Sequence, residues 1–332
     1  AAGLYATGRT GGLPFERYHR GEMTTHSLDS HLSKSKATDS AASGTAMATG
    51  RKTNSKIVSQ TPDGEDLETV LEYAKKQGKW TGLVTTAPMT HATPATFGAH
   101  AEKRTMYSVI AECYFTQTRP NVLFGAYYAK GVGVTEQKAV DAGYTVVKTR
   151  DAMNAFAAKV VPVGNGDQPA AFHVSGQFAA GMMPWEYGGP INVKHRLNYR
   201  NRTKATYATA PHLSEMTAAA LKLLARGPDG FFLMVEGSSI DWAGHDNVVQ
   251  WSVFETLEFA KAFQVALGWA KGRRDTLIIV TADHECGDLK VAGSGGRGRF
   301  PQVSWGSRNH TGVNVPVYAW GGGAERLEGV ID

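Results

Sequence analysis

Residues 227–241 have the sequence GPDGFFLMVEGSSID, and this stretch decides the fold class. A Gly-Pro-Asp-Gly turn precedes five consecutive apolar residues, Phe231 to Val235, and the acidic Glu236 follows them directly. An unbroken apolar run of this length is typical of a strand that is buried on both faces of a parallel sheet. The sequence therefore predicts a buried strand that ends at a carboxylate.

The segments on either side alternate between strand-like and helix-like patterns. Further strands are expected at 80–86, at 277–280 and, as the last strand of the chain, at 315–320. Helices are expected where Leu67, Val70, Leu71 and Ala74 recur at helical spacing, from a cap at Ser214 to Gly227, and over about 247–271. Short buried strands that alternate with helices predict an α/β fold with a mostly parallel central sheet and helices on both faces.

Composition narrows the class of protein. The 332 residues are 42% hydrophobic and 20% charged, which fits one large α/β domain over residues 1–332 and excludes a disordered chain. An irregular excursion is expected at about 160–212. The net charge is +5, but the basic residues are scattered, so no nucleic-acid partner is expected, and no apolar stretch is long enough to span a membrane. Whether Cys113 and Cys286 pair is left open.

Chemically versatile side chains follow several of the predicted strands. Glu236, Asp241 and His245 come after one strand, and the dipeptide Asp283-His284 comes after another. Ligands of open α/β sheets bind at the carboxyl ends of the strands, so we expect these side chains at one edge of one sheet.

Two aspartates and three histidines in this set suit a zinc site. Asp241 and His245 are four residues apart, which places both on one face of a helix, and His310 supplies a further imidazole. Taken alone, each pair is better explained as a salt link on a solvated surface. Their joint placement at strand ends favours Zn²⁺.

The segment 38–46, TDSAASGTA, offers a site for phosphate. A serine at the start of a helix brings its hydroxyl next to free backbone N–H groups that attract anions, although Ser40 is equally typical of a simple helix cap. Arg104 is a surface cation by the same reasoning, unless its planar fork faces the site and holds two phosphate oxygens.

Five segments together resemble the motifs of the alkaline phosphatase family, in the same order and context: 38–46, 91–95, 235–241, 280–284 and 310–312. The resemblance extends over the whole chain and is weakest across 130–210. It implies the family's α/β fold and the hydrolysis of small phosphate monoesters through a phosphoserine. His91 and Trp242 resemble the His/Trp pair near the metal site of compact bacterial members.

The resemblance also assigns roles to individual residues. It makes Ser40 the nucleophile and Arg104 the group that clamps the phosphate, with His91 and Trp242 beside the substrate. It implies two zinc sites and one magnesium site. The first zinc would be held by Asp241, His245 and His310, the second by Asp283, His284 and Ser40, and the magnesium by Thr93 and Glu236.

The chain departs from the family pattern at both ends. The family begins with a strand that ends in Asp-Gly-Met-Gly, whose aspartate bridges the second zinc and the magnesium, and it ends in a closing helix. Neither is expected here, because 1–5 resembles the helix that follows that strand. We therefore expect a chain that is partial at both ends, with each of those two metal sites short of one carboxylate.

The resemblance further implies a periplasmic or secreted enzyme that forms a homodimer, as relatives commonly do. Two other functions stay open at this point. One is a phosphodiesterase of the same superfamily. A sulfatase of that superfamily is disfavoured, because it would need a different nucleophile motif. The other is a non-catalytic protein that binds phosphate or metal, which the absent aspartate makes physically feasible.

Overall fold

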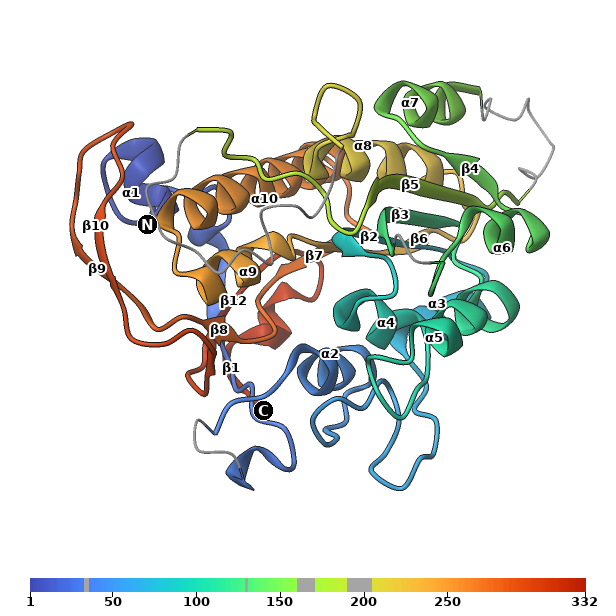
Figure 1. Cartoon of the computed structure of the whole chain (residues 1–332), viewed down its shortest axis with the longest axis horizontal. Helices are drawn as coiled ribbons and strands as arrows, with labels where there is room; N and C mark the ends of the chain where they lie inside the picture. Colours follow the sequence, from blue (N-terminus) through green and yellow to red (C-terminus); the bar gives the residue numbers. More distant parts are fainter. Residues whose placement is uncertain (33–35, 129–130, 160–170, 190–204) are drawn as a thin grey trace.

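The computed structural model describes residues 1–32, 36–128, 131–159, 171–189 and 205–332 (Figure 1). Its centre is a five-stranded sheet with the order β4-β5-β3-β2-β6, in which every neighbouring pair is parallel. The strands are β2 (Trp80–Pro88), β3 (Val122–Tyr127), β4 (Thr145–Val147), β5 (Val174–Ala180) and β6 (Phe231–Glu236). The predicted parallel α/β sheet is confirmed.

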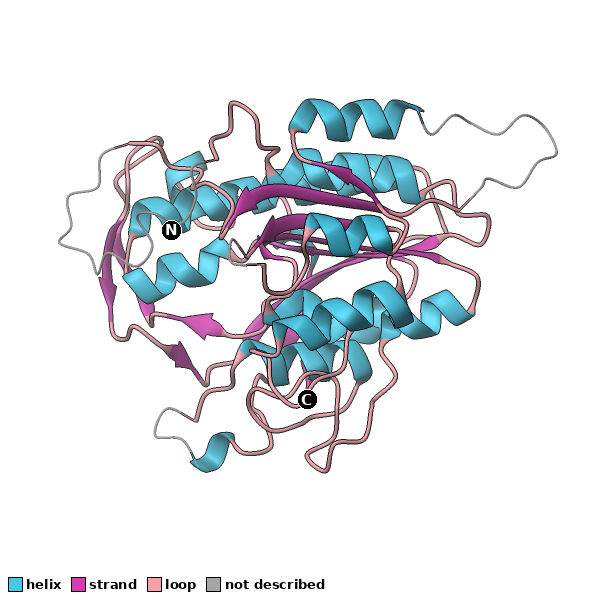
Figure 2. Cartoon of the chain, turned by 45° about the vertical axis from the view of Figure 1, so that its right-hand side comes forward, coloured by secondary structure: helices cyan, strands magenta, loops and turns pink. Residues whose placement is uncertain are grey.

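Helices lie on both faces of this sheet, as expected (Figures 1 and 2). The α-helices of the described residues are α1 (Ala2–Thr7), α2 (Ser40–Thr49), α3 (Val70–Lys76), α4 (Ala92–Gly98), α5 (Tyr107–Cys113), α6 (Glu136–Asp141), α7 (Arg150–Lys159), α8 (Leu213–Leu224), α9 (Ser239–Asp246) and α10 (Val249–Ala270), and α1 and α9 pack on α10. Among the helices of the described residues, none combines the length and the apolar character that a membrane span requires.

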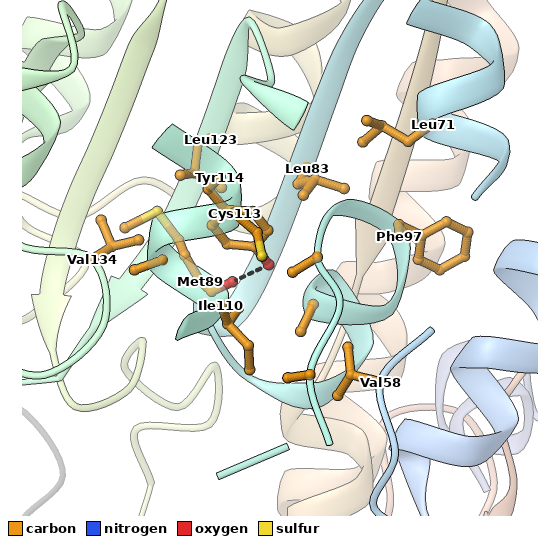
Figure 3. Packing of buried hydrophobic residues seen from close by; sticks show 14 of the residues in the cluster. Val58, Leu71, Leu83, Met89, Phe97, Ile110, Cys113, Tyr114, Leu123 and Val134 are labelled. Carbon is orange, nitrogen blue, oxygen red and sulfur yellow. Dashed lines mark hydrogen bonds between the residues drawn. The ribbon is translucent and has the colours of Figure 1, made fainter. Parts of the chain in front are cut away.

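The two faces of the sheet bury separate hydrophobic clusters. Leu83 and Val84 are neighbours on β2, so their side chains point to opposite faces. Leu83 packs with Leu71 and Ile110 beneath α3, α4 and α5 (Figure 3), whereas Val84 belongs to the cluster that includes Met216 of α8. Every residue of β2 is buried, so both faces of this strand lie inside the protein.

Two details of the central region differ from expectation. The predicted cap at Ser214 is wrong, because α8 begins at Leu213 with His212 at the N-cap. The backbone N–H of Ser214 instead donates to the buried carboxylate of Glu258, 2.9 Å away, which satisfies a donor that a capping side chain would otherwise serve.

The irregular excursion expected at about 160–212 is wrong in part. β5 lies within it and is an inner strand, paired with both β3 and β4. Its buried residues include Ser175, Gly176 and Gln177, which carry no apolar signal in the sequence. Residues 160–170 and 190–204 of the predicted excursion lie outside the described residues.

A second sheet, which the sequence did not predict, has the order β13-β1-β12-β7. Its strands are β1 (His19–Met23), β7 (Leu277–Val280), β12 (Val315–Gly321) and β13 (Gly329–Ile331). β12 runs antiparallel to both β1 and β7, so the 277–280 strand does not belong to the parallel sheet. The strand expected as the last one is followed by β13.

The chain between β7 and β12 forms two short antiparallel ladders. β8 (Glu285–Cys286) pairs with β11 (His310–Thr311), and β9 (Leu289–Gly293) pairs with β10 (Gln302–Trp305). The β8–β11 ladder matters most for function, because it brings the chain after β7 next to His310.

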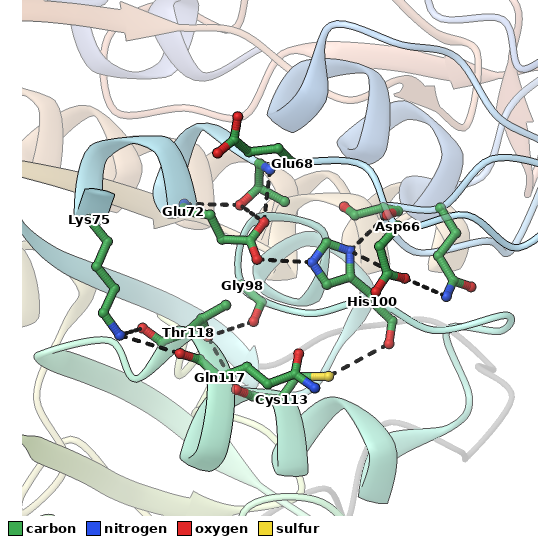
Figure 4. A network of polar contacts seen from close by, with 12 residues as sticks. Asp66, Glu68, Glu72, Lys75, Gly98, His100, Cys113, Gln117 and Thr118 are labelled. Carbon is green, nitrogen blue, oxygen red and sulfur yellow. Dashed lines mark hydrogen bonds and ion pairs between the residues drawn. The ribbon is translucent and has the colours of Figure 1, made fainter. Parts of the chain in front are cut away.

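A buried polar network joins α3 to the segment that leads to Arg104 (Figure 4). His100 Nδ1 lies 2.8 Å from Ser59 O, and its Nε2 lies 3.1 Å from Glu72 Oε1. Burial alone would lower the pKa of His100, but these hydrogen bonds and the charges of Glu72 and Asp66 raise it above its ordinary value. The imidazolium form of His100 therefore donates from both nitrogens.

We expect Glu72→Gln to lower the melting temperature by about 2–4 °C at pH 6, which corresponds to the loss of one buried charge-assisted hydrogen bond. Because the folded-state pKa of His100 is raised, this stabilisation is complete below about pH 6.5 and is lost as the pH rises through the folded pKa. The difference from wild type should therefore shrink at pH 9. Glu68→Gln, which removes an exposed partner of Lys76, is the matched control and should change little at either pH. A deficit that is equal at both pH values would contradict the role of His100.

Candidate active site

Ser40 is the first residue of α2, and its position follows from the local sequence. Asp39 is the N-cap, and its Oδ1 accepts a hydrogen bond from Ala42 N at 3.2 Å, so the simple capping role weighed for Ser40 belongs to Asp39. The Ser40 side chain is thus left to face the site, where its Oγ lies 3.0 Å from His284 Nε2. The hydroxyl sits at the positive end of a ten-residue helix.

Asp241, His245 and His310 form what we call the first donor cluster. Asp241 and His245 lie one turn apart on α9, and His310 reaches them from β11. His310 Nε2 is 3.4 Å from one Asp241 oxygen and 3.2 Å from His245 Nε2, which is itself 3.4 Å from the other Asp241 oxygen. Burial raises the pKa of Asp241, but the surrounding histidines outweigh it and hold that pKa well below its usual range.

The other nitrogen of each histidine fixes the direction of its ring. His245 Nδ1 lies 2.6 Å from Arg308 O, and His310 Nδ1 lies 2.8 Å from Thr38 O. A backbone carbonyl accepts only, so each Nδ1 carries a proton, and in the neutral ring each Nε2 has a lone pair available to a metal ion beside Asp241. Two imidazole lone pairs and a carboxylate that converge in this way fit a zinc ion.

Ser40, at the start of α2, and Asp283 and His284, between β7 and β8, form the second donor group. His284 Nε2 is 3.1 Å from Asp283 Oδ2, and the ring stacks on His310 with 3.4 Å between centroids. Burial would lower the pKa of His284, but the charges of Asp283 and Asp241 raise it to about 9. The two groups are therefore in direct contact.

Glu236 and Thr93 lie beside the second donor group. Glu236 ends β6 and is half-buried. Burial and the charges of Asp283 and Asp241 raise its pKa to about 7, although the hydrogen bonds of Thr85 and Thr93 act in the opposite direction. Three half-buried carboxylates thus gather in one place. Such a surplus of oxygen donors and negative charge fits a hard cation such as magnesium.

Arg104 is held in place between two other site residues. Its Nη1 lies 2.9 Å from Asp39 Oδ2, and its Nη2 lies 3.3 Å from His91 Nε2. The His91 ring in turn meets Trp242 edge to face, with 5.6 Å between centroids. The guanidinium therefore stands next to Ser40 rather than at a free surface.

The structure brings together every site residue that the sequence predicted, but not at the edge of one sheet. Glu236 ends a strand of the parallel sheet and His91 follows another, whereas Asp283 and His284 follow β7 of the second sheet and His310 lies on β11. The site lies where the sheets meet, because Glu236 and Asp283 are close enough for their charges to interact.

Sequence reasoning missed two residues of the site. Asp39 holds both the helix start and Arg104, and its place directly before a helix was a signal for it. Cys286 lies near the first donor cluster, two residues after His284. It is a free thiol, as is Cys113, which is buried in the core under α5.

Glu186, His212 and Glu258 form another set of potential metal ligands, away from this site. Here the donors already have partners. Glu186 pairs with His212 Nδ1 at 2.9 Å, and Glu258 accepts from Ser214 N and pairs with Lys261 at 3.0 Å. This set fastens the start of α8 to α10.

Comparison with known proteins gives a consistent result. The sequence family described as "Alkaline phosphatase" matches residues 6–121 and 134–299. Alkaline phosphatase 3 of Bacillus subtilis is 37% identical over 290 residues; the match covers 85% of this chain, which spans only 55% of the length of that relative.

Solved structures agree. A cold-active alkaline phosphatase from the psychrophile Shewanella sp. superimposes with a TM-score of 0.76 at 26% identity, covering 96% of this chain and 88% of the other. A mutant of the alkaline phosphatase from TAB5 with Mg bound has a TM-score of 0.72 at 24% identity, covering 98% and 88%.

Proposed function

The chain belongs to the alkaline phosphatase family, and from that membership we propose that it hydrolyses phosphate monoesters through a phosphoserine formed on Ser40. The observation that carries the proposal is the convergence of Ser40, Arg104 and the first donor cluster. A hydroxyl at a helix start, a guanidinium fork beside it and a zinc-type donor set are the parts that phosphoryl transfer needs.

Zinc suits the first donor cluster because both Nε2 lone pairs and the Asp241 carboxylate point to one place. Asp283, His284 and Ser40 are the residues for a second zinc, and Thr93 and Glu236 are those for magnesium. When bound, these dications stabilise the negative charge that develops on the oxygens of the transferring phosphoryl group.

The proposed reaction has two steps at Ser40 Oγ. Ser40 Oγ forms a bond to phosphorus as the bond from phosphorus to the alcohol oxygen breaks; the hydroxyl proton leaves to solvent, and the alcohol takes one up. Water then attacks phosphorus as the Oγ–phosphorus bond breaks; the water oxygen with one proton goes to inorganic phosphate, and Ser40 Oγ takes up a proton in place of the second one, which water gives up.

Arg104 acts in both steps by orienting the phosphoryl oxygens. Its two terminal nitrogens can each donate to one oxygen, which fixes the group in line with Ser40 Oγ. Asp39 keeps the fork in position through the 2.9 Å ion pair and holds the start of the serine helix with the same carboxylate. One residue therefore aligns the clamp with the nucleophile.

Three aryl esters test the proposal: p-nitrophenyl phosphate, bis(p-nitrophenyl) phosphate and p-nitrophenyl sulfate, each assayed with Zn²⁺ and Mg²⁺. We expect turnover of the monoester at a kcat/KM far above that of the others. A preference for the diester would assign the phosphodiesterase activity instead. Absence of turnover, with binding of Zn²⁺ and inorganic phosphate retained in calorimetry, would assign the non-catalytic binding function.

The proposal extends to the setting of the enzyme. A small phosphate monoester is the expected substrate, a periplasmic or secreted location follows the family, and a homodimer is the expected assembly. Fractionation of producing cells and light scattering of the purified chain test these two points.

His91→Asp should increase the dependence on magnesium. The substitution places a carboxylate beside Arg104 and two residues before Thr93, where added negative charge favours a hard dication. We expect Mg²⁺ content and activation by Mg²⁺ to rise several-fold, with the zinc content unchanged. His91→Asn, which adds no charge, is the matched control. Loss of zinc from His91→Asp, measured by elemental analysis, would show that His91 belongs to a zinc site.

A further inference from the structure

Cys286 lies directly opposite His310 on the β8–β11 ladder. Residues that face each other in this way project from the same side of the ladder, with their Cβ atoms about 5 Å apart. The Cys286 sulfur and one donor atom from each of Asp241, His245 and His310 all lie within 4.8 Å of one another. The sulfur therefore belongs to the same group of atoms as the first donor cluster.

Close packing of α9 against β8 sets up this arrangement. Gly244, on α9 between Asp241 and His245, has no side chain, and a Cβ placed there would lie 2.6 Å from Cys286 O and 3.0 Å from Cys286 Cβ. Only glycine allows the helix so near to the strand. The approach brings the two α9 donors to the cysteine.

One oxygen of Asp241 lacks a well-formed hydrogen bond in this arrangement. Asp241 Oδ1 is buried, and His310 Nε2 lies 3.4 Å from it without hydrogen-bond geometry. A buried carboxylate oxygen in that state costs free energy unless a cation completes it. It points to a ligand at the place where Cys286, His245 and His310 also converge.

Charge and donor type are consistent with the same ligand. Two neutral imidazoles and one carboxylate leave a bound dication with a net charge of +1, and a thiolate would bring the sum to zero. Zinc binds nitrogen, oxygen and sulfur donors together and can take a fifth ligand, so this donor set leaves a position for a phosphoryl oxygen, whereas magnesium avoids sulfur.

We propose that Cys286 Sγ is a fourth donor to the metal held by Asp241, His245 and His310. This inference rests on the metal centre of the proposed function. As the metal–sulfur bond forms, the S–H bond breaks and the proton is released to solvent. The sulfur makes the centre selective for Zn²⁺ and similar softer ions over Mg²⁺.

Cobalt substitution tests the proposal by spectroscopy. Co²⁺ in the full chain should show visible d–d bands and, in addition, a near-ultraviolet sulfur-to-cobalt charge-transfer band. Cys286→Ser and Cys286→Ala should lose the charge-transfer band and bind Zn²⁺ at least about 10-fold more weakly. Cys113→Ser, the matched control in the core, should keep both. Zn²⁺ should also protect Cys286 from alkylation by iodoacetamide, which peptide mass spectrometry measures.

The outcomes separate this inference from the metal centre itself. Visible bands without a charge-transfer band in the wild type, or a charge-transfer band that persists in both Cys286 variants, would overturn the role of Cys286 alone. Visible bands that remain in His310→Ala, or the absence of any cobalt spectrum in the wild type, would overturn the centre formed by Asp241, His245 and His310, and the sulfur donor with it.

Discussion

Ser40→Ala should abolish the phosphoenzyme and lower kcat by at least about 10³-fold, as the loss of a covalent nucleophile does in other enzymes. The substitution removes only Oγ. The start of α2 is held by Asp39, whose Oδ1 accepts from Ala42 N, so the helix and the neighbouring donors should stay in place. Intact-protein mass spectrometry after an acid quench with substrate should show a phosphate adduct in wild type and none in the variant.

Thr49→Ala, at the other end of the same helix, is the matched control for Ser40→Ala. Among the described residues its hydroxyl bonds at the helix end, to Thr45 O and to the N–H and C=O groups of Arg51. It should keep the adduct and the turnover. An adduct that survives in Ser40→Ala would place the nucleophile on another residue.

Asp241→Asn should reduce the zinc content by close to one ion per chain and lower kcat/KM by at least about 100-fold, because it removes the only negative charge of the first donor cluster. The amide keeps the shape of the side chain, so the effect should appear in metal content before it appears in folding. Elemental analysis after dialysis and the monoester assay measure the two quantities.

Asp63→Asn, at an exposed turn, is the control for Asp241→Asn and should keep both zinc and activity. Full zinc content in Asp241→Asn would show that the aspartate is not a ligand. Loss of zinc with normal turnover would show that the first donor cluster is dispensable for hydrolysis.

The strands that the sequence predicted are those buried on both faces or rich in aliphatic residues. β2 is buried along its whole length, and the apolar run Phe231–Val235 indicated β6 directly, although β6 lies at the edge of the sheet and most of its residues are half-buried. β1 has the sequence HRGEM and is held by pairing on both sides, to β12 and β13, which no local pattern indicates. The second sheet depends on contacts between residues about 300 positions apart, as in the pair His19 and Tyr318, and such contacts leave no periodic trace.

The site residues could be predicted because the family motifs lie at the ends of predicted strands. The contacts between these residues could not be predicted. Arg104 was assigned from its resemblance to the phosphate clamp, but its partner Asp39 is 65 residues away, and only the folded chain joins the two. Cys286 is similar, since its place opposite His310 follows from the β8–β11 register and from the missing side chain at Gly244.

The edge of β7 has a consequence for the behaviour of the chain in solution. Within the described residues β7 pairs only with β12, and Leu277 and Ile279 on its outer face are 44% and 50% exposed, whereas Ile278 packs inward. A free edge that combines unpaired backbone groups with aliphatic side chains is a template for any extended polypeptide. Unless such a strand covers β7, two copies can pair edge to edge. The protein concentration therefore limits the range in which this chain stays monodisperse.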